Sequence, residues 1–377
     1  VVASKHKLLM GPWVHGGHGS AYVGSCQQGE LTFDNACQWS DSLALRFFDF
    51  YLRNMNNGWE NEPVFRYYQI GNNQWLESSS IDSVLYQNQT YFFQPNGLLS
   101  QNSPTGINDF GLYLYNPADP SPTHGGCTLR TDLLQGPYDQ SQTVEARNDI
   151  LVFSSEYLLH DIEIFGKPNV HLWVSSDRKD TDFSIRLCDV YPDGRSMLIS
   201  DGIQRMRFRN GYTVNDTVSM QANAYYAIDI ELPYVAYTFL EGHKIRIDIT
   251  SSNYPRYDNN LNNGLTMYAA GDTLIATNKV YFNQNHSSFL TIPVKIPTII
   301  NENTVNAINV FPNPVDDYIY INGMDAIESI TLTDILGRST LLPLNTQYNV
   351  ADLKSGVYFL TIRLKNGNKH VEKVVKK

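Results

Sequence analysis

The sequence lacks any long hydrophobic run and carries little charge. Charged residues make up 18% of the 377 positions, and no apolar stretch approaches the roughly 18 residues that a membrane-spanning helix requires. The 28 Lys and Arg residues against 38 Asp and Glu give a net charge of -10, and the basic residues are scattered along the chain. Nucleic-acid binding depends on clustered positive charge and is therefore disfavoured.

Cysteine is scarce, and its spacing excludes the common zinc motifs. The four cysteines are Cys26, Cys37, Cys127 and Cys188, and no two of them have C-x-x-C spacing. Cys26 and Cys37 enclose a short polar loop, so they are the first pair to test for a disulfide. Free thiols at all four positions are the alternative.

An initiator methionine and a secretory leader are also missing, because the sequence starts at Val1. Tyrosine is abundant, with 24 residues, and the composition is that of a β-rich exported protein. Such a protein requires a leader. We therefore expect the sequence to be the C-terminal part of a longer protein, with two or three domains in this portion.

The first segment of the chain, residues 1–80, has the mixed pattern of an α/β domain. Lys5–Met10 predicts a short buried strand that ends at a Gly-Pro turn. An amphipathic helix is predicted over 41–54, with Ser40 or Asp41 as its N-cap and Asn57-Gly58 as its stop signal. Because a buried parallel strand needs neighbours on both sides, we expect this segment to lack packing partners and residues 1–50 to stay mobile.

The rest of the chain is predicted to be β-structure. Residues 81–295 have a period of two, as in HKIRIDIT, with turns between strands such as 191–195. This pattern predicts a jelly-roll (galactose-binding-like) β-sandwich. A Pro- and Asn-containing linker, 296–306, leads to a small β-sandwich over 307–377, with a hairpin turn at Asn366-Gly367. The fold class is therefore mainly β, with an α/β remnant at the start.

Two histidines after the first strand, in GPWVHGGHG, are the first candidates for chemistry. In α/β-hydrolases the triad histidine lies on a loop after the last strands of the sheet, which is where His15 is predicted to lie. A metal site of His6, His15 and His18 is the rival interpretation, but no carboxylate or thiol stands close by in the sequence. Asp119, flanked by prolines, predicts a rigid turn rather than a calcium site.

A family resemblance supports the catalytic interpretation of His15. GPWVHGG and ALRFFDFYLRN resemble the end of the hydrolase domain in the cocaine-esterase and glutaryl-acylase-like hydrolases, which are related to α-amino-acid ester hydrolases and X-Pro dipeptidyl-peptidases. The resemblance covers roughly residues 5–295. It continues through YNPADPSPTHGG, GPYDQSQTVEARNDILVFSSE, DTDFSIRLCDVYPDGRSMLISDGIQRMRFR and GHKIRIDITSSNYPRYDNNLNNG.

The resemblance assigns roles residue by residue. It implies that His15 is the triad base and that Trp13 shapes the wall of the substrate pocket, with no cofactor or metal. His18 lies outside the motif and is expected to be an ordinary loop histidine. The family's nucleophile lies in a Gly-x-Ser-Tyr-x-Gly elbow, and this sequence contains no Gly-x-Ser-x-Gly pattern and no acidic residue before His15. We therefore expect the serine and the triad carboxylate to precede Val1, and the chain alone to be inactive.

The final segment resembles the type A sorting domain of the type IX secretion system, through NVFPNPVDD, LTDILGR and LKSGVYFLTIR. This resemblance implies export across the outer membrane and a place at the cell surface or outside the cell. The leading hypothesis is a secreted serine hydrolase of acyl esters or peptide-like amides. The alternative is a secreted binding or adhesion protein, whose sugar-binding candidates would be Tyr225, Tyr226, Tyr234 and Tyr237.

Overall fold

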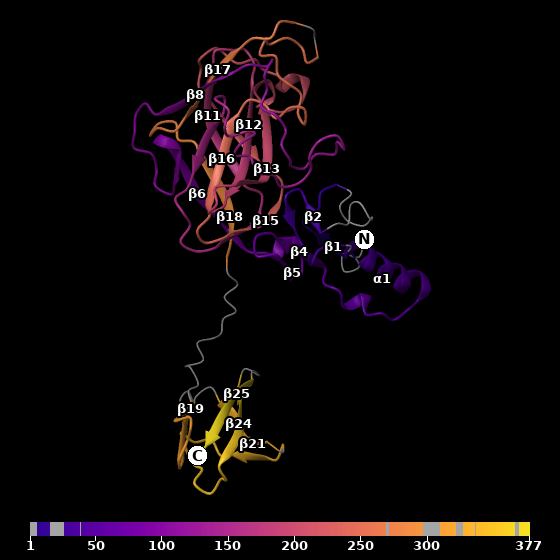
Figure 1. Cartoon of the computed structure of the whole chain (residues 1–377), viewed down its shortest axis with the longest axis vertical. Coiled ribbons are helices and arrows are strands. Elements are labelled where there is room, and N and C mark those ends of the chain that lie inside the picture. The colour runs from indigo at the N-terminus through magenta and orange to yellow at the C-terminus, as the bar shows by residue number, and fades with distance from the viewer. Residues whose placement is uncertain are drawn as a thin grey trace. The chain divides into compact units, whose positions relative to one another are not determined.

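The computed structural model describes residues 6–15, 26–37, 39–268, 271–296, 310–321, 327–335, 337–365 and 369–377. The chain divides into two units, Val1–Ile296 and Pro297–Lys377 (Figure 1). Most of the predicted linker 296–306 and the whole of the Asn366-Gly367 turn lie outside the described residues. Among the described residues, no helix is long and apolar enough to cross a membrane.

The first unit begins with a small sheet of order β1-β4-β5, in which β1 (Leu8–Met10) pairs in parallel with β4 (Phe65–Gln69). The expectation that the first strand lacks any sheet neighbour was therefore wrong, whereas the mobility of residues 1–50 stays a prediction. β4 is a later segment of the same chain, and it also pairs with β5 (Gln74–Ser78) through an antiparallel hairpin. Among the described strands, β1 pairs with β4 alone, so its other edge has no strand partner.

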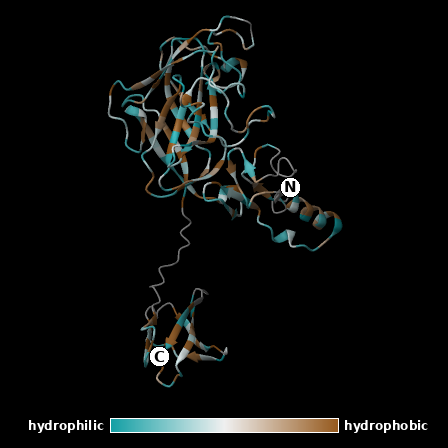
Figure 2. Ribbon diagram, in the orientation of Figure 1, coloured by the Kyte–Doolittle hydropathy of each residue, from teal (hydrophilic) through white to brown (hydrophobic). Residues whose placement is uncertain are grey.

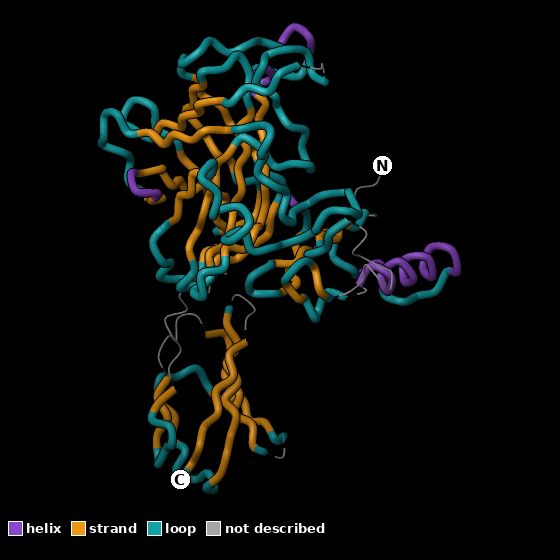
Figure 3. The backbone as a smooth tube through the Cα atoms, turned by 45° about the horizontal axis from the view of Figure 1, so that its top comes forward, coloured by secondary structure: helices purple, strands orange, loops and turns teal. Residues whose placement is uncertain are grey.

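The predicted helix is α1 (Trp39–Arg53), and it ends earlier than its sequence suggests. Asn54, with φ 51°, takes the left-handed conformation that stops helices, so Asn57-Gly58 is not the stop signal. Large apolar side chains of α1 remain exposed; Leu45, Phe48 and Leu52 retain 66%, 52% and 73% of their surface. Figures 2 and 3 show α1 extending away from the large sheet, with hydrophobic residues along it.

A 13-stranded sheet forms most of the first unit, in the order β13-β12-β16-β9-β7-β6-β18-β11-β17-β8, with β10, β14 and β15 attached to the side. It encloses a large hydrophobic core. The strands are β6 (Tyr86–Gln94), β7 (Leu98–Ser100), β8 (Phe110–Tyr115), β9 (Leu151–Ser154), β10 (Ile162–Gly166), β11 (Asn169–Ser176), β12 (Asp182–Val190), β13 (Ser196–Arg205), β14 (Tyr226–Glu231), β15 (Val235–Phe239), β16 (Lys244–Thr250), β17 (Ala276–Tyr281) and β18 (Phe289–Lys295).

Strand β16 shows how the two-residue period builds this core. Ile245, Ile247 and Ile249 are fully buried in it, and the alternate residues face the other side of the sheet. That other side is also covered, because Asp248 is fully buried and Arg246 forms an ion pair with Glu145 from the long loop between β8 and β9. The predicted 191–195 turn joins β12 to β13, with the Tyr191 N–H donating to the Arg195 carbonyl at 2.8 Å.

The second unit consists of two small sheets around a shared core. One has the order β19-β20-β23 and the other β22-β21-β24-β25. Their strands are β19 (Val310–Phe311), β20 (Tyr318–Ile321), β21 (Ile327–Asp334), β22 (Ser339–Leu342), β23 (Gln347–Asn349), β24 (Gly356–Leu364) and β25 (Lys369–Lys376).

Candidate functional site

The GPWVH motif leaves the small sheet directly after β1. Its first residue, Gly11, leaves no room for a side chain, because the Trp13 ring packs against it. A Cβ atom on Gly11 would lie 2.4 Å from two atoms of the Trp13 ring, far inside van der Waals contact. The Trp13 indole Nε1–H donates to the Ala36 carbonyl at 2.8 Å. The Val14 amide donates to the Gln28 side-chain oxygen at 3.0 Å. The two residues before His15 are therefore held by side-chain-to-backbone bonds to one loop.

His15 itself is exposed and lies in a turn at the end of a described segment. Among the described residues, none forms a hydrogen bond with its imidazole. His18 lies outside the described residues, and His6 is exposed at the start of the first described segment. In the described part of the chain, no group of three ligands includes a histidine.

The loop that holds the motif is closed by the disulfide Cys26–Cys37. It contains a two-stranded hairpin, β2 (Gln27–Gln28) with β3 (Leu31–Thr32), and its Phe33 and Ala36 are buried. We call residues 26–37 the disulfide loop. The described structure contains no second disulfide, since Cys127 and Cys188 are free thiols.

The disulfide loop packs against the small sheet through Asn35. Tyr68 donates to the Asn35 side-chain oxygen at 2.6 Å, and the Trp75 indole donates to the Asn35 carbonyl at 2.9 Å. Burial, with a smaller contribution from the charge of Asp34, raises the pKa of Tyr68 to about 12, so its phenol remains a donor at physiological pH. Trp75 also contacts the Trp13 ring, with 5.9 Å between ring centroids.

The opposite side of the disulfide loop packs against the large-sheet part of the unit. The Glu30 amide donates to the Pro137 carbonyl at 2.9 Å, and the Asp139 amide donates to the Glu30 carboxylate at 3.1 Å. Gly29 has φ 59°, and a Cβ there would lie 2.3 Å from the Pro137 oxygen, so only glycine allows this approach. The loop thus contacts the motif, the small sheet and the large sheet.

An apolar cavity of about 260 Å³ lies where these three parts meet. Trp13 is part of its wall. The free thiol of Cys127, an exposed residue, also lines it. Other lining residues are Met10, Pro12, Val14, Leu31, Phe33, Tyr68, Ile70, Pro137, Leu198, Ile199, Tyr234, Val235, Ala236 and Tyr237.

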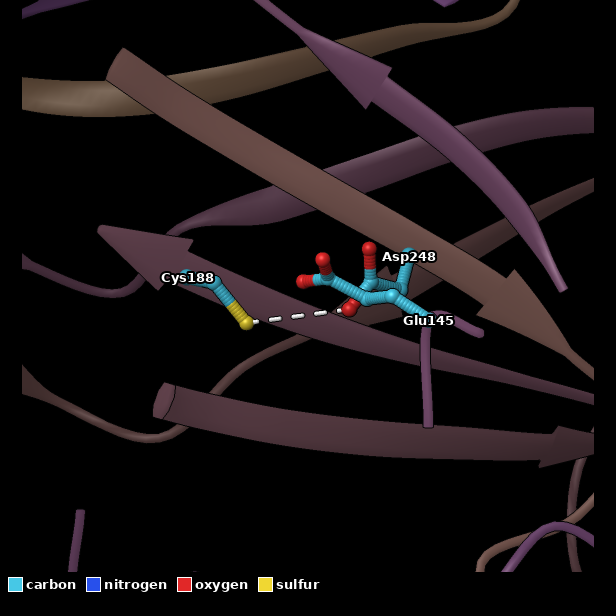
Figure 4. Close-up of side chains that lie close together, drawn as sticks. All are labelled: Glu145, Cys188 and Asp248. Carbon is cyan, nitrogen blue, oxygen red and sulfur yellow. Dashed lines mark hydrogen bonds between the residues drawn. The ribbon is translucent and has the colours of Figure 1, made fainter. Parts of the chain in front are cut away.

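The group most suited by residue type to hold a metal lies elsewhere, on the covered face of the large sheet. Glu145, Cys188 and Asp248 have potential ligand atoms within 4.8 Å of one another (Figure 4). Burial raises the pKa of Asp248 well above its usual value, and the charge of Glu145 raises it further. Two guanidinium groups counter these carboxylates, because Arg246 pairs with Glu145 and the buried Arg186 lies near Asp248. The positive charge beside these carboxyl groups is therefore supplied by the protein's own guanidinium groups.

The four tyrosines considered as sugar-binding candidates do not form a common surface. Tyr237 is buried and donates to Asp189 at 2.8 Å, while Tyr234 lines the cavity. Tyr226 packs beneath the Arg209 guanidinium at 4.6 Å. Tyr225 is 53% exposed and stacks on the His286 ring with 4.4 Å between centroids.

Sequence reasoning did not identify Gln28, Ala36 or Cys127 as part of this site. The only signal for the disulfide loop was the Cys26 and Cys37 pair, which the sequence marked for testing. Backbone acceptors such as the Ala36 carbonyl have no residue-type signature, and the cavity is assembled from segments far apart in the chain.

Comparison with protein families gives two matches along the chain. Residues 57–291 match the X-Pro dipeptidyl-peptidase C-terminal non-catalytic domain, and residues 309–377 match a secretion system C-terminal sorting domain.

Individual relatives are named as hydrolases. The chain is 32% identical over 304 residues to the cocaine esterase of Rhodococcus sp. (strain MB1 Bresler), covering 76% of this chain and 51% of that protein. It is 24% identical over 308 residues to a putative serine esterase of Mycobacterium bovis, covering 77% of this chain and 46% of that protein. The chain thus spans about half the length of the curated relatives it matches.

Similar solved structures also match about three quarters of this chain and about half of their own length. An α-amino acid ester hydrolase is similar with a TM-score of 0.65 and 27% identity, over 77% of this chain and 50% of that one. An aminopeptidase from a marine sediment Thaumarchaeota archaeon has a TM-score of 0.67 at 24% identity, over 77% of this chain and 49% of that one, and shows a shared fold.

Proposed function

The chain belongs to the hydrolase family that carries the X-Pro dipeptidyl-peptidase C-terminal domain, and it ends in a type IX secretion sorting domain that indicates export. From this premise we propose that it is the C-terminal part of a secreted serine hydrolase that cleaves acyl esters or peptide-like amides. His15 is the general base and acid of the triad. The serine, the triad carboxylate and the oxyanion donors come from residues N-terminal to Val1.

The observation that carries this proposal is the fixed placement of the GPWVH motif beside an apolar cavity. Trp13 and Val14 are each anchored by a hydrogen bond, and both line the cavity, while the adjacent His15 is exposed. An exposed imidazole next to an apolar pocket is what an acyl-transfer site requires from its base. The family relatives named as esterases support the same reaction class.

Unpaired and exposed surfaces of the small sheet and α1 support the proposal that the serine lies in preceding residues. Parallel strands are normally covered on both faces and paired on both sides, but β1 pairs with β4 alone among the described strands. Beside it, α1 exposes Leu45, Phe48 and Leu52, and a groove of about 270 Å³ lies between β1 and α1. These surfaces suit the remainder of an α/β sheet and its helices. We propose that the hydrolase residues preceding Val1 pack there.

In the proposed mechanism, His15 accepts the proton of the serine hydroxyl as its oxygen bonds to the substrate carbonyl carbon. The tetrahedral intermediate collapses when His15 returns this proton to the leaving alcohol or amine. In the second half, His15 takes a proton from water, whose oxygen attacks the acyl-enzyme carbonyl. The proton then goes to the serine oxygen, and the carboxylic acid product is released.

The large sheet has a supporting role in this proposal, as a jelly-roll sandwich that walls the pocket. Leu198, Tyr234 and Ala236 from its strands and loops line the same cavity as Trp13. The lining is predominantly apolar, and a volume of about 260 Å³ accommodates a small aryl or branched aliphatic group. The cavity therefore favours substrates with an apolar acyl or leaving group.

Two measurements test the proposal. The 377-residue chain alone should not hydrolyse p-nitrophenyl esters above background, because an imidazole without a nucleophile contributes little. In the protein encoded by the complete gene, His15→Ala should lower kcat by about 10³-fold and leave KM within a few-fold. His18→Ala is the control and should change kcat only mildly. A His15→Ala protein that keeps a tenth of the wild-type kcat would exclude this role, and a gene lacking an upstream serine elbow would favour a binding protein.

A further inference from the structure

The disulfide loop holds the backbone on the N-terminal side of His15 more directly than the sheet does. β1 ends at Met10, and from there to His15 the chain is irregular. In this stretch Trp13 is bonded to the Ala36 carbonyl at 2.8 Å, and Val14 to the Gln28 side chain at 3.0 Å. Both acceptors belong to the disulfide loop.

The loop is itself anchored to two other parts of the unit. Asn35 accepts from Tyr68 and Trp75 of the small sheet, at 2.6 and 2.9 Å. Glu30 exchanges hydrogen bonds with Pro137 and Asp139 of the large-sheet part, at 2.9 and 3.1 Å. The loop therefore fixes the residues preceding His15 relative to the small sheet and to the large-sheet part of the unit.

The covalent closure of the disulfide loop determines how rigidly the loop holds the residues preceding His15. The disulfide Cys26–Cys37 joins the two ends of the loop. The Phe33 amide donates to the Cys26 carbonyl at 2.7 Å, and the Ala36 amide donates to the Phe33 carbonyl at 2.9 Å. The hairpin β2–β3 has only two residues on each strand, too short to be stable in isolation. Without the disulfide, Gln28 and the Ala36 carbonyl would lose their fixed separation.

We infer that the disulfide loop is the positioning element of His15 and that catalysis depends on oxidation of Cys26 and Cys37. The inference rests on the proposed function of His15. Gln28 is a positioning residue, since it acts through the Val14 amide. Oxidation removes two protons and two electrons from the two thiols, and a disulfide-bearing exchange partner outside the cytoplasm accepts the electrons. The protein would thus become fully active only after export.

Hydrogen exchange on the 377-residue chain tests the positioning without any assay of activity. In the oxidised chain, the Val14 amide should be protected by its bond to Gln28. The Cys26→Ser/Cys37→Ser double variant, or treatment with dithiothreitol, should lower this protection by about tenfold or more. The double variant should not respond to dithiothreitol, because Cys127 and Cys188 are already free thiols. Equal protection of Val14 in all samples would overturn the inference.

Kinetics on the protein from the complete gene separate positioning from simple destabilisation. A fluorophosphonate titration counts the active sites, and kcat is expressed per titrated site. Both the double cysteine variant and Gln28→Met should lower this kcat by about tenfold or more, with KM within about threefold. Gln27→Met is the matched control, since Gln27 is exposed on the same short strand and bonds to the nearby Gly29 carbonyl.

The outcomes distinguish the two proposals. Fewer titrated sites with an unchanged kcat per site would show a purely structural role of the loop and overturn the inference. If the wild-type protein neither hydrolyses esters nor reacts with the fluorophosphonate, the proposed function fails. The exchange of the Val14 amide then still decides whether the disulfide controls the position of the motif.

Discussion

Replacing Gly11 with alanine should release the disulfide loop from the GPWVH motif. The added Cβ would lie 2.4 to 2.5 Å from three atoms of the Trp13 ring, about 1 Å closer than atoms normally pack. The ring must therefore turn or shift, which breaks its 2.8 Å bond to the Ala36 carbonyl. Ala36 is 1% exposed, so that carbonyl would lose its partner without gaining water. Leaving this buried carbonyl without a partner costs about 1–3 kcal/mol.

This cost is measurable as a loss of hydrogen-exchange protection in the disulfide loop. At about 1.4 kcal/mol for each factor of ten, amides of residues 26–37 should exchange roughly 5- to 150-fold faster in Gly11→Ala than in the wild type. A double-mutant cycle supplies the control. In a Trp13→Ala background there is no ring to displace, so Gly11→Ala should have almost no further effect. Wild-type protection in Gly11→Ala, or fully additive effects in the cycle, would refute the steric explanation.

Two further predictions concern the rest of the chain. Because burial raises the pKa of Asp248, the unfolded chain releases this proton at lower pH than the folded one, so the stability contributed by this group is lost as pH rises. Asp248→Asn should therefore melt at about the wild-type temperature near pH 4 and at least about 3 °C higher at pH 8 in calorimetry. Asp272→Asn, on an exposed carboxylate, is the control and should melt like the wild type at both pH values. A lower melting temperature of Asp248→Asn at pH 8 would mean that Asp248 is ionised and paired. Limited proteolysis should cut first near 296–306, at the boundary between the two units, and first cuts within 150–290 would contradict this organisation.

The two-residue period of the sequence correctly predicted which residues of a strand face the hydrophobic core. The alternation in β16 placed Ile245, Ile247 and Ile249 on one face, and all three are in the core. The same alternation does not reveal that the opposite face is covered, because the covering segment around Glu145 is irregular and has no period. The burial of Asp248 could therefore not be read from its own strand.

Pairings between distant segments were harder to predict than the strands themselves. The sequence indicates a strand at Lys5–Met10, and β1 forms there. Its partner β4 follows only after the disulfide loop and α1, so no turn signal connects the two. A parallel pair of this kind is set by contacts across the whole intervening segment rather than by neighbouring residues.

The position of His15 illustrates why a motif alone does not define a site. The family resemblance predicts that His15 is the triad base, and β1 fixes the chain only as far as Met10. From Gly11 to His15, where the described segment ends, the backbone is in no strand, and its direction is set by Gln28 and the Ala36 carbonyl. Neither acceptor belongs to a residue type or spacing that marks catalysis, and the Ala36 carbonyl would be present whatever residue stood there. The two cysteines that close the loop are the only sequence feature that points to this arrangement, because a disulfide fixes the separation of two segments that the backbone alone leaves free.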